Sequence, residues 1–250
     1  MEIMEHIKSL AEEGRLLADA AEAAGPDAPV PTCPDWRVRD LLRHTGMVHR
    51  WATAFVAEGH ASYHPAEDPP GLDGAELLAW FREGHGLLVA ALTGADDALE
   101  CWTFLPAPSP RAFWARRQAH ETTVHRVDAQ SAAAGPVAEV APPFAADGID
   151  ELLCGFHARE KSRVRTPEPS VLRVRATDTG DVWTLRLSDR APRVERSGEG
   201  PADCEVSGPA AALYMTLWNR LPDGTPGTAV SVSGDERLAR LWRETSAVTW

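Results

Sequence analysis

The segment RRQAHETTVHRVDA, residues 116–129, concentrates side chains that bind metal ions or transfer protons. It contains His120, Glu121, His125 and Asp128. The HExxH helix of zinc proteases needs two histidines that are four residues apart. Here the two histidines are five residues apart, which separates them by about 140° around the axis of an α-helix. They cannot bind one ion from a regular helix, so the protease interpretation fails.

Glu121 and His125 have the spacing that lets two side chains bind the same metal ion. Residues four apart on a helix differ by about 40° in direction and lie on the same face. Asp128, three residues further on, lies near that face. It is a candidate to orient a ligand histidine, and a salt bridge on the helix surface is the alternative. Because a catalytic zinc site usually has three protein ligands and an open position, another element must supply the third ligand.

The segment LLRHTGMVHRW, residues 41–51, offers this third ligand. His44 follows Leu41 by three residues and precedes Val48 by four, so it is expected on the apolar side of a helix. His49 lies about 140° from His44 and is the weaker alternate. Inward-facing ligands from separate helices are how helix bundles build metal sites. A helical E-x-x-x-H pair is also common as a simple surface contact, so spacing alone leaves both interpretations open.

Four helices are expected to position these residues. Pro-rich segments interrupt the helical patterns at residues 25–36, 64–74 and 105–111, and proline and glycine end helices. Four helices of roughly 20 residues each, joined by loops, predict a four-helix bundle. The helices are expected over residues 2–24, from a start near 35–38 to the loop at 64–74, over about 75–92 and over about 113–134.

The second half of the chain has a different pattern. VLRVRATDTGDVWTLRLS, residues 171–188, alternates apolar and polar residues on both sides of a turn, which predicts a β-hairpin. Residues 204–207 are a candidate strand. Residues 209–220 indicate a helix with Pro209 in its first turn. The last part predicts a strand over 228–234 and a short helix over 235–242.

The two halves are expected to form separate domains. The boundary falls in AAGPVAEVAPPF, residues 133–144. We predict a metal-binding four-helix bundle over residues 1–138 and a small α+β domain over residues 145–250. The fold class is therefore α+β.

Composition restricts the possible partners. With 25 basic and 37 acidic residues, the net charge is −12, which disfavours nucleic acid because phosphate binding needs a basic face. No apolar run approaches the ~20 residues that span a bilayer, and the N-terminus lacks an apolar signal segment. The four cysteines form no CxxC pattern. These features predict a cytoplasmic protein with reduced thiols and no membrane partner.

Other conspicuous side chains have structural interpretations. Trp36 is expected to be a packing anchor before the second helix, since buried aromatic rings contribute strongly to core stability. Arg116, Arg117 and Arg126 suggest a basic patch around the fourth helix. A solvated face is the favoured account of this patch, and contact with an anion at the mouth of a cleft is the alternative.

Two segments carry a resemblance to a known family. PTCPDWRVRDLLRHTGMVHRWA, residues 31–52, resembles the N-terminal segment of the mycothiol-dependent maleylpyruvate isomerase family, within the DinB-like metalloenzyme superfamily. The shared features are a Cys-Pro-x-Trp turn and a helix of the form D-L-L-x-H. ETTVHRVDA, residues 121–129, resembles the family's fourth-helix motif, E-x-x-x-H-x-x-D. The second half, ending in VSGDERLARLW at residue 242, resembles the family's smaller C-terminal domain.

The resemblance implies a fold and a metal site. The fold is a DinB-like four-helix bundle followed by a small α+β domain. The metal is a divalent ion, typically zinc, and the matching ligands here are His44, Glu121 and His125. The family also uses an arginine of the C-terminal domain that follows a glycine. The nearest match is Arg220, which follows Asn219 instead of glycine.

The resemblance also implies a thiol cosubstrate, mycothiol. A metal-bound thiol is deprotonated, and the thiolate is the nucleophile. The expected activity is an S-transferase or a maleylpyruvate isomerase-like enzyme that acts on a small-molecule electrophile. The alternative is a non-catalytic protein that binds a metal or a small ligand. Neither the electrophile nor the choice among zinc, nickel and other divalent ions follows from the residues.

Overall fold

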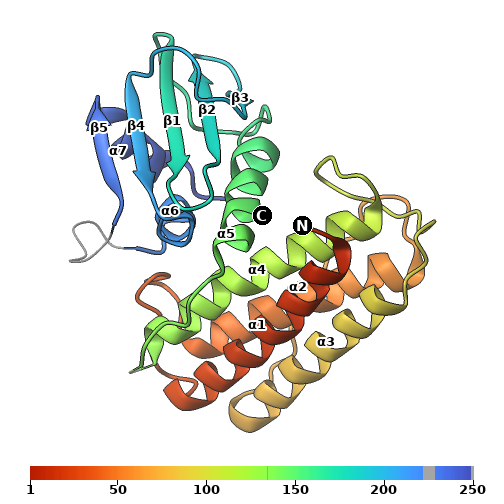
Figure 1. Cartoon of the computed structure of the whole chain (residues 1–250). Coiled ribbons are helices and arrows are strands. Elements are labelled where there is room, and N and C mark those ends of the chain that lie inside the picture. Colours follow the sequence, from red (N-terminus) through yellow and green to blue (C-terminus); the bar gives the residue numbers. More distant parts are fainter. Residues whose placement is uncertain (134, 222–228, 249–250) are drawn as a thin grey trace. The chain divides into compact units, whose positions relative to one another are not determined.

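The structure is a computed structural model that describes residues 1–133, 135–221 and 229–248. The chain divides into two compact units, Met1–Ala138 and Glu139–Trp250 (Figure 1). Among the described residues, the named elements of the first unit are all helices, with one isolated β-bridge between Pro29 and Arg37, and the second unit contains a five-stranded mixed sheet with helices. The predicted α+β fold class is confirmed. Two residues at the ends of predicted elements, 134 and 228, lie outside the described residues.

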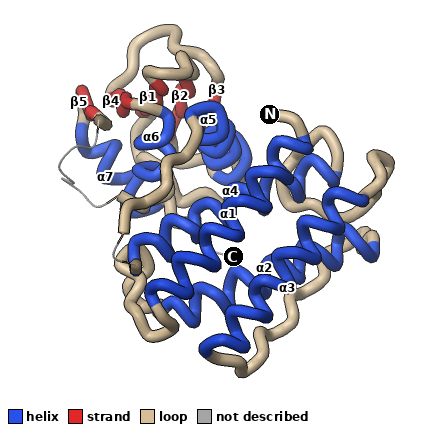
Figure 2. Tube along the Cα trace, turned by 60° about the horizontal axis from the view of Figure 1, so that its bottom comes forward, coloured by secondary structure: helices blue, strands red, loops and turns tan. Residues whose placement is uncertain are grey.

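Four long helices build the first unit. α1 packs mainly against α4, and α2 packs mainly against α3 (Figure 2). Their apolar faces meet in one core that takes Leu17 from α1, Leu41 from α2, Phe81 from α3 and Ala129 from α4. The four helices are α1 (Ile3–Ala24), α2 (Val38–Glu58), α3 (Gly74–Gly94) and α4 (Pro110–Ala132).

The starts of the helices are set by side chains that accept backbone hydrogen bonds. Asp40 accepts from the backbone N of Arg37 at 2.9 Å, and its negative charge lies in the first turn of α2, where the helix dipole favours an anion. Ser109 accepts from the backbone N of Ala112 at 3.1 Å, with a proline in the first turn of α4. These caps fix where the candidate ligands fall along α2 and α4.

Glycines let α2 and α3 approach closely. A Cβ atom added at Gly46 of α2 would overlap the ring of Trp80 on α3, and one added at Gly84 of α3 would overlap Arg50 on α2. Arg50 lies over Trp80, with its guanidinium carbon 4.1 Å from the ring centroid. The two helices therefore interlock through two large side chains, each seated against a glycine.

The second unit begins with a helix that the sequence patterns do not predict. α5 (Pro142–Asp150) continues directly into a π-helix (Glu151–Phe156). The paired prolines at residues 142 and 143 indicate a linker when considered alone, but proline is well tolerated in the first turn of a helix. Burial of Phe144, Ile149 and Leu153 stabilises this segment. Tertiary packing thus outweighs a weak local signal.

The sheet of the second unit has the strand order β3-β2-β1-β4-β5. β1 and β2 form the predicted antiparallel hairpin, β1 pairs with β4 in parallel, and β5 pairs antiparallel with β4. The three-residue edge strand β3 was not predicted. The strands are β1 (Ser170–Ala176), β2 (Val182–Leu187), β3 (Arg193–Glu195), β4 (Cys204–Gly208) and β5 (Ser231–Gly234), and the remaining helices are α6 (Ala210–Leu217) and α7 (Glu236–Thr245).

All four cysteines carry free thiols. Among the described residues, no helix is both long enough and apolar enough to cross a lipid bilayer.

The contact between α2 and α3 generates a test with a matched control. We expect Gly46→Ala to lower the free energy of unfolding by about 1–3 kcal/mol, because the added methyl group forces the Trp80 ring to shift. Gly86→Ala, also within a helix but facing open space, should leave stability unchanged or raise it by up to about 1 kcal/mol. Urea unfolding of both variants measures the difference, and equal effects would contradict the packing argument.

Candidate metal centre

The structure brings His44, Glu121 and His125 together. One ligand atom from each residue lies within 4.8 Å of the others. The Nε2 atom of His44 lies 3.4 Å from Oε1 of Glu121, and the Nε2 atom of His125 lies 3.2 Å from the same oxygen. Glu121 and His125 share one face of α4 as their spacing predicts, and α2 supplies His44 from across the bundle. Two imidazoles and a carboxylate are a donor set that fits zinc and other divalent transition metals.

The cluster is mostly buried and opens on one side. The side chains of Glu121 and His125 are 5% and 8% exposed, whereas that of His44 is 19% exposed. Solvent therefore approaches the cluster past His44.

Asp128 lies behind His125. Its Oδ2 atom is 2.9 Å from Nδ1 of His125, and its Oδ1 atom accepts a hydrogen bond from the Thr32 hydroxyl at 2.6 Å. The thiol of Cys33 also donates to Oδ2 at 3.7 Å. Asp128 is fully buried, so this is no exposed surface salt bridge. A proton on Nδ1 leaves Nε2 directed at Glu121, which is the arrangement that orients a ligand histidine.

Trp36 contacts the candidate ligands in addition to packing against the core. Its ring centroid lies 4.9 Å from that of His44 and 5.9 Å from that of His125, and it stacks on the latter at 25°. The same ring also packs against the hydrophobic core of the bundle. Trp36 thus forms a wall beside both imidazoles. Trp36 and His44 are close in sequence, and this proximity is the sequence signal for the contact between their rings.

The predicted solvated patch on α4 is wrong for Arg117 and Arg126, while Arg116 is half-buried. Arg117 is 1% exposed and Arg126 is 0% exposed. Arg117 donates to Oε2 of Glu121 at 3.1 Å, and Arg126 donates to Oε2 of Glu13 on α1 at 2.6 Å. A buried guanidinium needs a carboxylate partner, and the partner on α1 is not visible from the sequence of α4 alone.

The electrostatics of the cluster favour a cation. Burial by itself would raise the pKa of Glu121, but hydrogen bonds with His125 and His44 and the charge of Arg117 bring that pKa well below its ordinary value. Burial by itself would lower the pKa of His125, but Asp128 and Glu121 raise it to about 9. An ionised carboxylate beside so basic an imidazole is a setting in which a metal ion competes with a proton.

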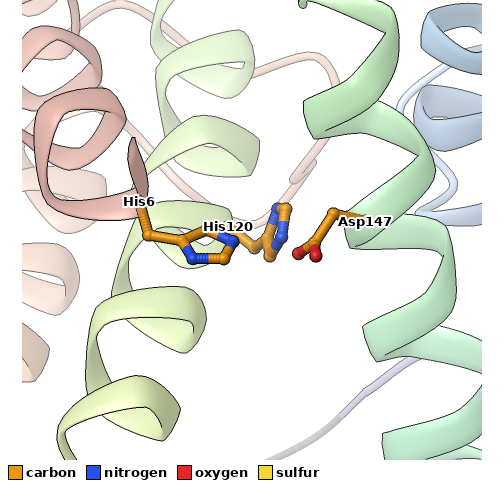
Figure 3. A group of neighbouring side chains, drawn as sticks. All are labelled: His6, His120 and Asp147. Carbon is orange, nitrogen blue, oxygen red and sulfur yellow. The ribbon is translucent and has the colours of Figure 1, made fainter. Parts of the chain in front are cut away.

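The other histidines of α2 and α4 lie elsewhere in the bundle. His49 is fully buried, and its Nε2 atom is 2.9 Å from the Thr122 hydroxyl, so it does not join the ligand group. His120 points towards α1, where its ring meets that of His6 edge to face, with centroids 6.0 Å apart (Figure 3). The predicted divergence of His120 and His125 is therefore observed.

Arg220 belongs to the second unit, just after α6. Its backbone N donates to Met215 O at 2.8 Å, and its Nη1 donates to Trp218 O at 2.9 Å. The preceding residue, Asn219, has a φ of 58°. This left-handed conformation favours glycine, and asparagine is among the few other residues that adopt it readily. Asparagine in place of the family's glycine therefore fits the local backbone. A role for Arg220 in the site stays a prediction.

A helix bundle with an inward-facing His-Glu-His cluster defines a candidate metalloprotein of the bundle class. Two family models match the chain. Residues 7–130 match the mycothiol maleylpyruvate isomerase N-terminal domain, and residues 143–241 match the MDMPI C-terminal domain of the same family. The chain belongs to the mycothiol-dependent maleylpyruvate isomerase family.

Solved structures agree at the level of the fold. The crystal structure of a mycothiol-dependent maleylpyruvate isomerase is 13% identical, with 93% of each chain covered and a TM-score of 0.61. A variant of that enzyme with one histidine replaced by alanine is 11% identical over the same coverage, with a TM-score of 0.64. No match is found among curated proteins. At such low identity the likeness describes the fold alone.

The proton balance of His125 generates a second test. NMR titration of metal-free protein should show that His125 loses its proton near pH 9. Burial lowers the pKa of His157 to about 4, so His157 should stay neutral until the pH falls to about 4. Because the folded-state pKa of His125 exceeds its ordinary value of 6.5, its stabilising effect is complete below pH 6.5 and is lost as pH rises through 9. Asp128→Asn should lower the His125 midpoint and leave that of His157 unchanged. A His125 midpoint near 6.5 would contradict the assigned contacts.

Proposed function

We propose that this chain is a cytoplasmic, divalent-metal-dependent thiol enzyme that uses mycothiol. The proposed metal ligands are His44, Glu121 and His125, with zinc as the first candidate ion. The observation that carries the proposal is the convergence of these three side chains in a chain whose two halves both match the family. The substrate is a small-molecule electrophile.

A divalent ion at this site would lower the pKa of a bound thiol and so supply a thiolate nucleophile. The chain's own residues prepare the site for this role. Asp128 accepts the Nδ1 proton of His125 and keeps Nε2 free for the ion. Arg117 holds Oε2 of Glu121, which leaves Oε1 directed at the two histidines. Trp36 covers both imidazoles on one side and limits access of water.

Two reactions are compatible with a thiolate in this position. In an isomerase, the thiolate adds to a conjugated double bond and leaves after rotation about the resulting single bond. In an S-transferase, the carbon–sulfur bond to the electrophile remains. A general S-transferase is the broader proposal, because fold and ligand set do not fix the substrate. Arg220 is proposed to hold a substrate carboxylate, which a guanidinium binds through two parallel hydrogen bonds.

Metal analysis tests the ligand assignment. We expect purified protein to contain close to one divalent ion per chain and His44→Ala to lose most of it, because only two ligands remain. His49→Ala is the matched control, since it removes a histidine of the same helix that lies outside the cluster. It should keep its metal if folded, as judged by circular dichroism. Equal metal content in wild type and His44→Ala would overturn the site.

Turnover tests the enzymatic role. Zinc-loaded protein incubated with mycothiol and monochlorobimane should form the bimane conjugate faster than metal-free protein or His44→Ala. Maleylpyruvate in place of the bimane tests the isomerase reaction. If zinc binds but no electrophile in a broad panel reacts, the chain is a non-catalytic metal or ligand binding protein and the proposed activity is wrong.

A further inference from the structure

The first unit contains a cavity whose lining does not include the candidate metal ligands. It is bounded by α2, by the loop that follows α2 and by Trp80 of α3. Its volume is about 500 Å³, within the range of roughly 300–1,000 Å³ typical of small-molecule sites. His44, Glu121 and His125 are not among its lining residues.

Aromatic and aliphatic side chains form part of the lining of this cavity. Met47, Trp51 and Ala54 come from successive turns of α2, and Trp80 faces them from α3. Trp51 is held in place by a hydrogen bond from its Nε1 to His64 O at 2.6 Å, and by an edge-to-face contact with Trp114. The apolar surface is therefore preformed, which lowers the entropic cost of binding a ligand.

The stacked imidazoles of His60 and His64 also line this cavity. The rings of His60 and His64 lie nearly parallel, with centroids 4.6 Å apart and an interplanar angle of 16°. The loop that carries them is anchored by the backbone N of Trp102, which donates to His60 O at 2.8 Å. The pair adds a flat surface and ring nitrogens to a lining that is part apolar and part charged.

The charges around the cavity are mainly negative. Three carboxylates, Glu58, Glu67 and Asp68, belong to its lining. Among the described residues that line it, Arg50 carries the one guanidinium, and Glu83 outside the cavity balances that charge at 2.8 Å. The lining thus leaves an excess of negative charge next to tryptophan rings. Carboxylates repel an anion, whereas a cation gains from both the carboxylates and the ring faces.

We propose that this cavity binds a small organic cation, an amine or quaternary ammonium group attached to an aromatic or aliphatic body. The body contacts Trp51 and Met47, and the cationic group lies near Glu67 and Asp68. Arg50 stacked on Trp80 already shows a cation on one of the cavity's aromatic rings. The site uses residues other than the candidate metal ligands, so it stands or fails independently of the proposed enzymatic activity.

Three probes of similar size separate the effect of charge from that of hydrophobicity. Isothermal titration calorimetry with phenethylamine, phenethyl alcohol and phenylacetate should give the tightest binding for the amine, weaker binding for the alcohol and the weakest for the carboxylate. Added salt should reduce the advantage of the amine, because exposed charges are screened. Equal or tighter binding of phenylacetate, or no binding of phenethylamine up to about 10 mM, would overturn the proposal.

A double variant tests whether the amine binds in this cavity. Glu67→Gln with Asp68→Asn should weaken phenethylamine binding by about three- to tenfold, since each exposed charge contributes modestly. Both residues are exposed on a loop, so folding is not at risk. Asp189→Asn with Glu199→Gln makes the same charge change at exposed positions of the second unit and should leave binding unchanged. His44→Ala should also leave it unchanged, which separates this site from the metal centre. If both double variants bind the amine as wild type does, the assigned cavity is wrong.

Discussion

The carboxylate of Glu121 is an ionised group inside a helix bundle, and the polar structure of the first unit is arranged around it. Isolated burial of such a charge is strongly unfavourable. Glu121 is stabilised because one oxygen faces the imidazoles of His44 and His125 and the other accepts a hydrogen bond from Arg117. Removing any one partner leaves the remaining groups imperfectly paired. The same arrangement that makes the carboxylate tolerable in the core also makes it a ligand for a cation.

α4 carries this arrangement because it is buried on nearly all sides although its sequence is polar. Several of its polar residues find partners in neighbouring elements rather than in water. Arg126 pairs with Glu13 on α1, and Asp128 receives hydrogen bonds from the turn before α2. Buried polar networks of this kind specify one arrangement of the helices when every member is satisfied. Here the network also sets the direction of a candidate ligand, since Asp128 is the partner of His125.

The turn before α2 joins the capping of a helix to the chemistry of the site. Its threonine and cysteine contact Asp128, and Trp36 lies across both imidazoles. Asp40, a few residues later, starts α2 at the position that directs His44 inward. Local sequence signals thus determine where the turn ends and the helix begins. The contact of the turn with α4 depends on the packing of segments almost a hundred residues apart in the chain.

Sequence by itself determined the four helices, the hairpin and the face that Glu121 and His125 share, because helical and strand periodicities are local properties. It selected His44 over His49 by its apolar neighbours. It did not determine α5, whose prolines indicate a linker until burial stabilises the helix, or the environment of Arg117 and Arg126. Those arginines appear as a solvated patch when α4 is considered alone. Only the tertiary structure decided that they are buried, because their carboxylate partners and the surrounding helices are brought near by packing and not by sequence spacing.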